Sequence, residues 1–305
     1  MSFFATLQVM LTILFVVGMG VLANRLKFLD AETDRRLSKL ILNITIPCLI
    51  IASVTRQASL PEPRVILTVL EVAAVFYLLE FVFIALIPHL VGGTAAQKGV
   101  WRFMLCFPNI GFIGYPLVQA LFGDQGFFYA VILALPFNVL NYTLAPLLVS
   151  GKKVFSWRQF CTPGILCSFV ALAIALWDIH LPAVVGEMAG LVGDVTVPLS
   201  LVVLGSILAG RPMGRVFSSW RVWVMSAVRL LVLPAALSIV LGLMGVDALI
   251  LGVAVAQMAM PVAVNGSMFC LEYGGDADTM AQSIFLTTIL SMVTIPICAV
   301  LFMQF

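Results

Sequence analysis

Proline and asparagine residues interrupt two long apolar runs of the chain, in a pattern that suggests anion binding rather than catalysis. Pro108-Asn109 stands within one run, and Pro261, followed by Asn265, stands within another. A proline removes a backbone donor and clashes with the preceding turn, so each run is expected to unwind there. The next helical segment would begin with free N–H groups and a partially positive dipole end, which favour an anion.

Eight residues around these breaks are candidates for binding a substrate. Asn109 is the first choice, because it follows the first proline directly. Asn138 and Asn141 are three residues apart and therefore share one helix face. Each polar residue alone could instead form an interhelical hydrogen bond, as buried polar groups in membranes often do. The full set is Asn43, Pro108, Asn109, Asn138, Asn141, Gln257, Pro261 and Asn265.

Four charged residues are expected inside apolar helices, where ionisable groups usually mark function. They are Glu71, Glu80, Asp194 and Arg229. Glu80 and Arg229 each lie eight residues from the cytoplasmic end of their helix, which places both about 12 Å deep and allows an ion pair. That pair is either structural, or Arg229 attracts anions while Glu80 or Asp194 carries a coupling proton.

No motif supports enzymatic chemistry, so the chain is not expected to be an enzyme. His89 and His180 are the two histidines, and they fall at opposite membrane borders. No zinc, nucleophile-elbow or phosphate-loop motif occurs. The six cysteines sit in or beside apolar runs without a CxxC pair, as packing residues do. We expect no metal and no cofactor beyond a coupling proton or sodium ion. The net charge of +2 gives no sign of a nucleic-acid partner.

The elements that must position these residues are membrane helices. The chain is 62% hydrophobic and 10% charged, whereas soluble domains carry about 25% charged residues. Its apolar runs are long enough to cross a bilayer, and the first is expected to be retained rather than cleaved as a signal peptide. The sequence predicts ten helices, near 3–23, 37–55, 64–87, 100–121, 126–149, 160–177, 183–208, 220–243, 247–271 and 277–303. Residues 25–36 are expected to form a short interfacial helix, with Asp30 as a candidate N-cap.

Basic residues predict the orientation, because they concentrate in cytoplasmic loops. Thirteen of the sixteen lie on one side: Arg25, Lys27, Arg35, Arg36, Lys39, Lys98, Arg102, Lys152, Lys153, Arg158, Arg211, Arg215 and Arg221. Arg56 and Arg64 lie on the other side. Both termini are therefore expected outside, in a multi-pass protein of the inner (plasma) membrane.

Matching motifs indicate an internal repeat. Asn43-Ile-Thr-Ile-Pro47 matches Asp194-Val-Thr-Val-Pro198, and Pro108, Asp124 and Pro146 have counterparts in Pro261, Asp276 and Pro296, all at offsets of 150 to 153 residues. We expect a first five-helix unit over 1–150, a cytoplasmic linker over 151–159 and a second unit over 160–305. An odd helix count inverts the second unit, as in many secondary transporters.

The sequence resembles the auxin efflux carrier family, which includes plant auxin exporters and bacterial relatives known as malonate transporters. The resemblance rests on LSKLILNITIPCLIIAS, FPNIGFIGYPLV, GDQGFFYAV and QMAMPVAVNGSMF with EYGGDAD, and spans the chain. It implies a fold like that of sodium/bile-acid symporters and the NhaA antiporter, with helices four and nine crossing at their prolines. It also implies that Asn109 and Asn141, with Asn138 as the alternative, contact a carboxylate, and that a homodimer forms through scaffold helices.

The expected function is secondary transport of a small organic anion. The substrate would be a mono- or dicarboxylate such as malonate or an auxin-like acid, moved by an elevator-like or rocking motion that a proton gradient or the membrane potential drives. The family's acid–lysine pair in helix three is not matched here, since that helix offers Glu71 and Glu80 without a lysine. A sodium-coupled symporter of the bile-acid type is one alternative, and a non-transporting membrane receptor is another.

Overall fold

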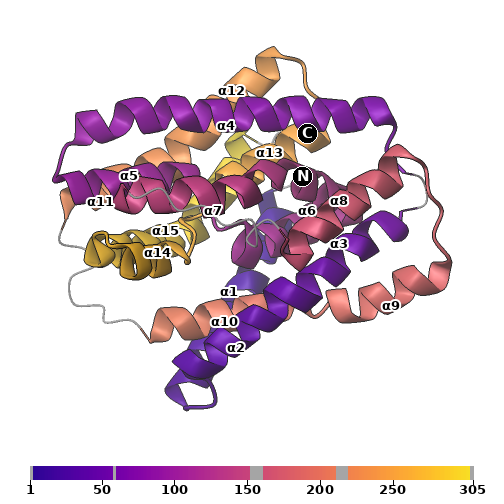
Figure 1. The fold of residues 1–305 in the computed structure, drawn as a ribbon, viewed down its shortest axis with the longest axis horizontal. Coiled ribbons are helices and arrows are strands. Elements are labelled where there is room, and N and C mark those ends of the chain that lie inside the picture. Colours follow the sequence, from indigo (N-terminus) through magenta and orange to yellow (C-terminus); the bar gives the residue numbers. More distant parts are fainter. Residues whose placement is uncertain (1–2, 58–59, 152–160, 211–218, 303–305) are drawn as a thin grey trace.

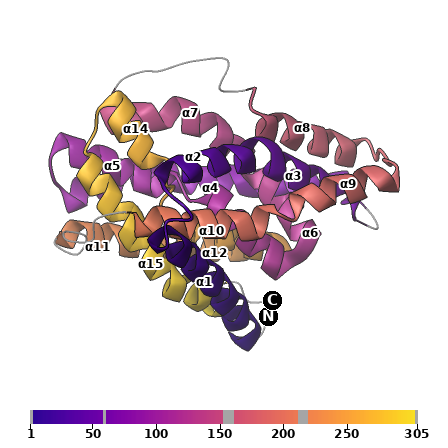
Figure 2. The same cartoon turned by 90° about the horizontal axis from the view of Figure 1, so that it is seen from below.

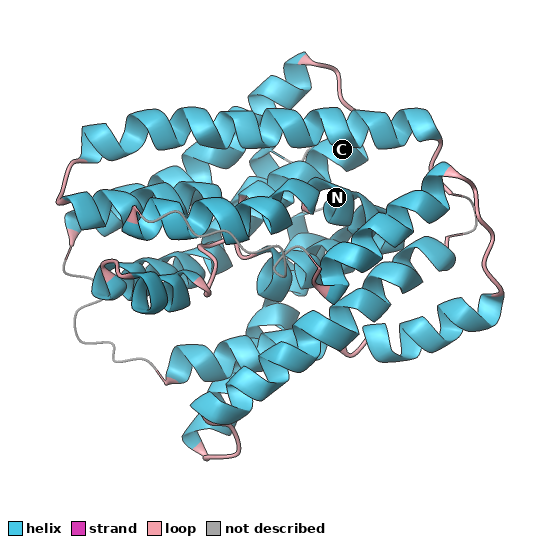
Figure 3. Ribbon diagram, in the orientation of Figure 1, coloured by secondary structure: helices cyan, strands magenta, loops and turns pink. Residues whose placement is uncertain are grey.

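The computed structural model describes residues 3–57, 60–151, 161–210 and 219–302, and over these the chain is all-helical (Figure 3). Six runs in this part are long and apolar enough to cross a membrane: Ala31–Thr55, Pro63–Val91, Ile110–Leu133, Ala183–Ala209, Trp220–Leu243 and Ala277–Phe302. Helices suit that environment because they satisfy their own backbone hydrogen bonds where water is absent. The fold is therefore that of a helical membrane protein.

The first half of the chain contains seven α-helices and two π-helical turns within its described residues. They are α1 (Phe3–Arg25), α2 (Ala31–Leu40), η1 (Ile41–Thr45), α3 (Ile46–Thr55), α4 (Pro63–Val91), α5 (Ala95–Cys106), η2 (Ile110–Gly114), α6 (Tyr115–Leu133) and α7 (Leu135–Ser150). The linker predicted at 151–159 lies, apart from Gly151, outside the described residues.

The second half continues with shorter segments. They are α8 (Pro163–Leu176), α9 (Ala183–Gly193), α10 (Thr196–Ala209), α11 (Trp220–Ala227), η4 (Val228–Val232), α12 (Leu233–Leu243), α13 (Ala248–Met258), α14 (Gly266–Tyr273) and α15 (Ala277–Phe302). Each π turn precedes a helix that has a proline at its second position: Pro47, Pro116 and Pro234. A missing proline N–H disturbs the regular ladder, which explains why the wider turns occur there.

Helices far apart in sequence pack side by side. α1 lies against α10, α3 lies between α8 and α9, and α5 and α14 both contact α7. The long α4 runs along one side of the molecule and packs on α5 (Figure 1). The beginning of α1 and the end of α15 lie next to each other in both views (Figure 2). The two interrupted helices, α5–α6 and α13–α14, lie against each other through the packing of α13 on α6.

Several helices differ from the predicted boundaries. Helix two begins at Ala31 rather than 37, so the second half of the expected interfacial helix belongs to it. Asp30 is its N-cap, as predicted, and its Oδ1 accepts the Thr33 N–H at 2.8 Å. The helix expected over 183–208 is interrupted at Asp194 and Val195, between α9 and α10. A break of this kind hardly changes how apolar the stretch of sequence is, so the hydropathy of the sequence does not reveal it.

Candidate functional site

The two interrupted helices meet at their prolines. Pro108 and Val262 form an isolated antiparallel bridge. The Asn109 N–H donates to the Pro261 carbonyl at 2.7 Å, and the Ala263 N–H donates to the Phe107 carbonyl at 2.9 Å. The unwound backbone of each helix therefore satisfies groups of the other, which is how non-helical backbone is tolerated at membrane depth.

A cavity of about 220 Å³ opens beside this crossing. Its polar wall includes Asn43, Asn109, Asn141 and Asn265, four of the predicted site residues, together with Pro108. Its apolar wall comes from α3, η2, α6, α7 and α8, through Ile46, Ile50, Phe112, Tyr115, Phe137 and Ile165. No lysine, arginine or carboxylate lines it among the described residues. A ligand would therefore meet neutral amides on one side and hydrocarbon on the other.

Asn109 has an unused donor at this cavity. Its side chain is 2% exposed, and its Oδ1 accepts the Phe112 N–H at 3.2 Å, capping the start of η2. Its Nδ2 has no partner among the described residues. A buried amide without a partner costs free energy, so an acceptor in the cavity would satisfy it.

The side chains of the other predicted amide residues differ in their hydrogen-bond partners and in their distance from the cavity. The Asn265 Nδ2 donates to Asn141 Oδ1 at 3.0 Å, which joins α14 to α7 and leaves Asn265 Oδ1 without a partner among the described residues. Asn43 is exposed, and its amide donates to the Lys39 carbonyl of its own helix at 2.8 Å. The side chain of Asn138 lies outside the described part of the structure. Gln257 is buried away from the cavity and donates to the Ala130 carbonyl at 3.0 Å.

Glu80 and Arg229 form the predicted ion pair. Arg229 Nη1 lies 3.1 Å from Glu80 Oε1, and both side chains are fully buried. Arg229 also donates to the Leu105 carbonyl at 3.1 Å and, through Nε, to the Met260 carbonyl at 3.2 Å. Neither member of the pair lines the cavity. Arg229 therefore points towards backbone oxygens and does not line the cavity where an anion would bind.

The two remaining predicted charges lie elsewhere. Asp194 sits in the turn between α9 and α10 with its side chain 56% exposed, and it pairs with Arg56 through two bonds of 2.8 and 2.9 Å. Glu71 is exposed on α4 and lines a separate hollow with Arg64 and Asp247. The structure therefore does not bring Asp194 or Glu71 to the crossing.

Two groups of polar residues were missed by the sequence reasoning. Thr162, the N-cap of α8, and Ser168 within α8 line the cavity. The Thr-Pro sequence at this helix start was an available N-cap signal. Asp34 is 4% exposed and accepts a 2.8 Å bond from Ser206, to which Asn24 donates at 3.1 Å. Its arginine neighbours made Asp34 look like a surface residue.

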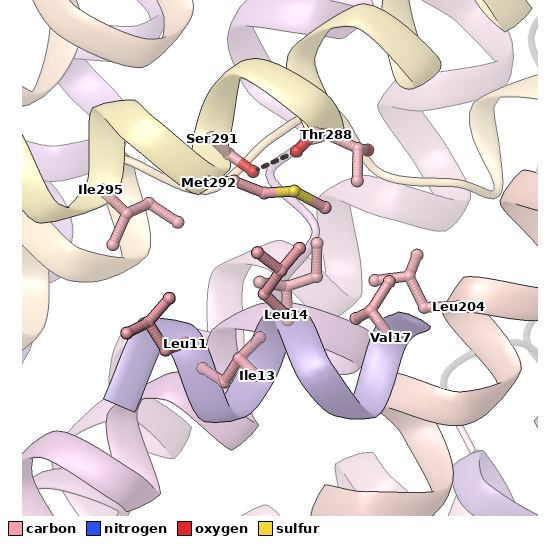
Figure 4. A pocket seen from close by; sticks show the side chains of 10 residues that line it. Leu11, Ile13, Leu14, Val17, Leu204, Thr288, Ser291, Met292 and Ile295 are labelled. Atoms are coloured by element: carbon pink, nitrogen blue, oxygen red, sulfur yellow. Dashed lines mark hydrogen bonds between the residues drawn. The ribbon is translucent and has the colours of Figure 1, made fainter. Parts of the chain in front are cut away.

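A second cavity, of about 80 Å³, lies between α1, α10 and α15. Figure 4 shows Leu11 and Leu14 of α1 facing Met292 of α15 across it. Ser291 and Thr288 line it, but their hydroxyls donate to carbonyls of their own helix at 2.7 and 2.6 Å. The hydroxyls that line this space are therefore not free for an anion, whereas Asn109 Nδ2 at the crossing has no partner among the described residues.

Comparison with known proteins gives the family. The profile of the family described as "Membrane transport protein" matches residues 5–153 and 143–299. An uncharacterized transporter of Methanothermobacter thermautotrophicus is 25% identical, with 98% of this chain and 99% of that protein aligned. An uncharacterized transporter of Methanocaldococcus jannaschii is 22% identical over 95% and 96%. A Rhizobium meliloti protein named "Putative malonate transporter" is 24% identical over 92% and 90%. The chain belongs to the membrane transport protein family, as its resemblance to the auxin efflux carriers predicted.

Proposed function

We propose that this chain is a secondary carrier of a small organic anion, which binds as a carboxylate at the crossing cavity. The observation that carries the proposal is the unpartnered Asn109 Nδ2, buried where two helices restart. Amide donors and helix N-termini together form a binding environment for an anion. The relative named for malonate, at 24% identity, supports the same class of substrate.

The uncharged lining of the crossing cavity limits the charge that a bound substrate can carry. With no fixed cation among the described lining residues, a second negative charge would be desolvated without compensation, which is costly. A monocarboxylate, or a dicarboxylate that carries one proton, therefore fits better than a dianion. The apolar wall suits the hydrocarbon part of such an acid.

The carrier would work by alternating access between two groups of helices. The cavity lies between α3 and α8 on one side and the crossing segments with α7 on the other. Movement of the crossing group against α3 and α8 would expose the cavity to each side in turn. We propose ten spans in two inverted five-helix units, supported by the paired interruptions and by the packing of α5 on α4 and of α13 on α12.

We further propose that a proton or the membrane potential drives transport. Glu80 is the candidate proton carrier, since its Oε2 is buried without a partner among the described residues. Asp194 is a weaker candidate because both its oxygens are occupied by Arg56.

Uptake by proteoliposomes tests the proposal. Purified protein is expected to move labelled malonate or a monocarboxylate, faster with an imposed pH gradient or membrane potential, and with no change when choline replaces sodium. Loss of uptake in choline would assign sodium coupling instead. Transport that survives Asn109→Ala with Asn141→Ala would refute the site. Absence of both uptake and acid binding would favour a receptor.

A further inference from the structure

Arg229 contacts the C-terminal ends of both interrupted helices. Leu105, whose carbonyl it binds, lies in the last turn of α5, and Met260 follows the end of α13 by two residues. The Leu105 carbonyl has lost its intrahelical partner, because the N–H of Asn109 donates to Pro261 across the crossing instead. One guanidinium therefore joins two helix ends that lie more than 150 residues apart in sequence.

Elementary electrostatics favours this arrangement. The last carbonyls of a helix have no intrahelical donors and carry partial negative charge. Two such ends brought together in a dry interior repel each other, and no water is there to satisfy them. The planar guanidinium presents donors in a rigid fork, so it can bind both ends at once, and Glu80 balances its charge.

We propose that Arg229 is a positioning residue that sets the angle and distance between the two interrupted helices. Through them it places the starts of η2 and α14, including Asn109, at the cavity. Arg229 lies in the π turn η4, a distortion that often occurs at functional positions. The link to ligand binding rests on the proposed function, whereas the effect on the crossing does not.

Hydrogen exchange and acid binding test this role together. The Asn109 and Ala263 amides bond across the crossing, so exchange in peptides spanning 105–112 and 258–266 reports its geometry without any substrate. The double variant Glu80→Met/Arg229→Met removes both charges and leaves no unpaired ion. We expect these amides to exchange at least tenfold faster than in the wild type, while peptides from α1 and α10 keep wild-type rates. Acid affinity, from thermal shift, is expected to fall at least tenfold.

Arg229→Lys provides a second test if the double variant does not fold. Lysine keeps the charge opposite Glu80 but lacks the planar fork, so faster exchange at the crossing and weaker binding are again expected. Asn109→Ala is the matched control, expected to lose binding while the Ala263 amide stays protected. Wild-type exchange in either Arg229 variant would overturn the proposal. If no acid binds even the wild type, the proposed function fails while the exchange result still decides the role of Arg229.

Discussion

The asparagines of the cavity differ in whether their side-chain N–H groups already have a hydrogen-bond partner. Asn109 holds the start of η2 with its oxygen, and its nitrogen has no partner among the described residues, whereas Asn43 has committed its nitrogen to Lys39. A free, buried donor gains a full hydrogen bond from a ligand, while a donor already bonded exchanges one partner for another. Lining the same cavity therefore does not imply an equal contribution to binding.

Asn109→Ala is expected to weaken acid binding at least tenfold, whereas Asn43→Ala should change it less than about twofold. A hydrogen bond to a charged group contributes about 1.5–3 kcal/mol, and each 1.4 kcal/mol corresponds to about a tenfold change in affinity. Thermal-shift titrations of both variants against one carboxylate make the comparison. An equal loss of acid affinity in the two variants would contradict the different roles given to Asn109 and Asn43.

The exposed pair of Arg56 and Asp194 is expected to be dispensable for coupling. Exposed ion pairs contribute roughly 0–1 kcal/mol, and Asp194 is separated from the cavity lining. The double variant Arg56→Gln/Asp194→Asn should therefore lower the free energy of unfolding by less than about 1 kcal/mol and keep the pH dependence of uptake. A flat pH profile in this variant would make Asp194 the proton carrier.

At the scale of elements, the sequence predicts helix breaks where proline and glycine concentrate, and it fails where they do not. Pro108 and Pro261 signalled the interruptions in the core, and Asp30 signalled the start of α2. The turn at Asp194 and Val195 has one glycine before it, Gly193, and one proline after it, Pro198. The π turn at Arg229 is followed by a single proline among apolar residues. The contacts of Arg229 with Leu105 and Met260 depend on packing between three helices, which spacing within one sequence does not encode.

The packing of α1 on α10 predicts a contrast between two glycines of one helix. A Cβ added at Gly20 would lie 2.0 Å from the Val202 carbonyl oxygen, whereas one at Gly18 would meet no atom within 4 Å. Gly20→Ala must therefore push α10 away, at a cost of about 1–3 kcal/mol. Gly18→Ala should be neutral or slightly stabilising, because alanine favours helix. Melting temperatures in detergent compare them, and equal values would show that the two helices separate freely.

For the whole molecule, the neighbouring positions of the two chain ends limit how the spans can be arranged. The start of α1 and the end of α15 lie side by side, which agrees with an even number of crossings. The excess of lysine and arginine in alternate loops then predicts that the opposite face is cytoplasmic. The cavity, built from residues of both halves of the chain, would lie between these two faces.

Accessibility of single cysteines tests this orientation. Cys161 is exposed at the start of α8, next to the basic linker, so the charge pattern places it in the cytoplasm. A membrane-impermeant maleimide should label it in inside-out vesicles and leave it unlabelled in right-side-out vesicles. Asp178, exposed beyond the other end of α8, provides the matched position. Asp178→Cys, in a chain that also carries Cys161→Ser, should show the reverse. Labelling of both positions from one side would mean that α8 does not cross the membrane. That result would contradict the proposed second unit of five spans.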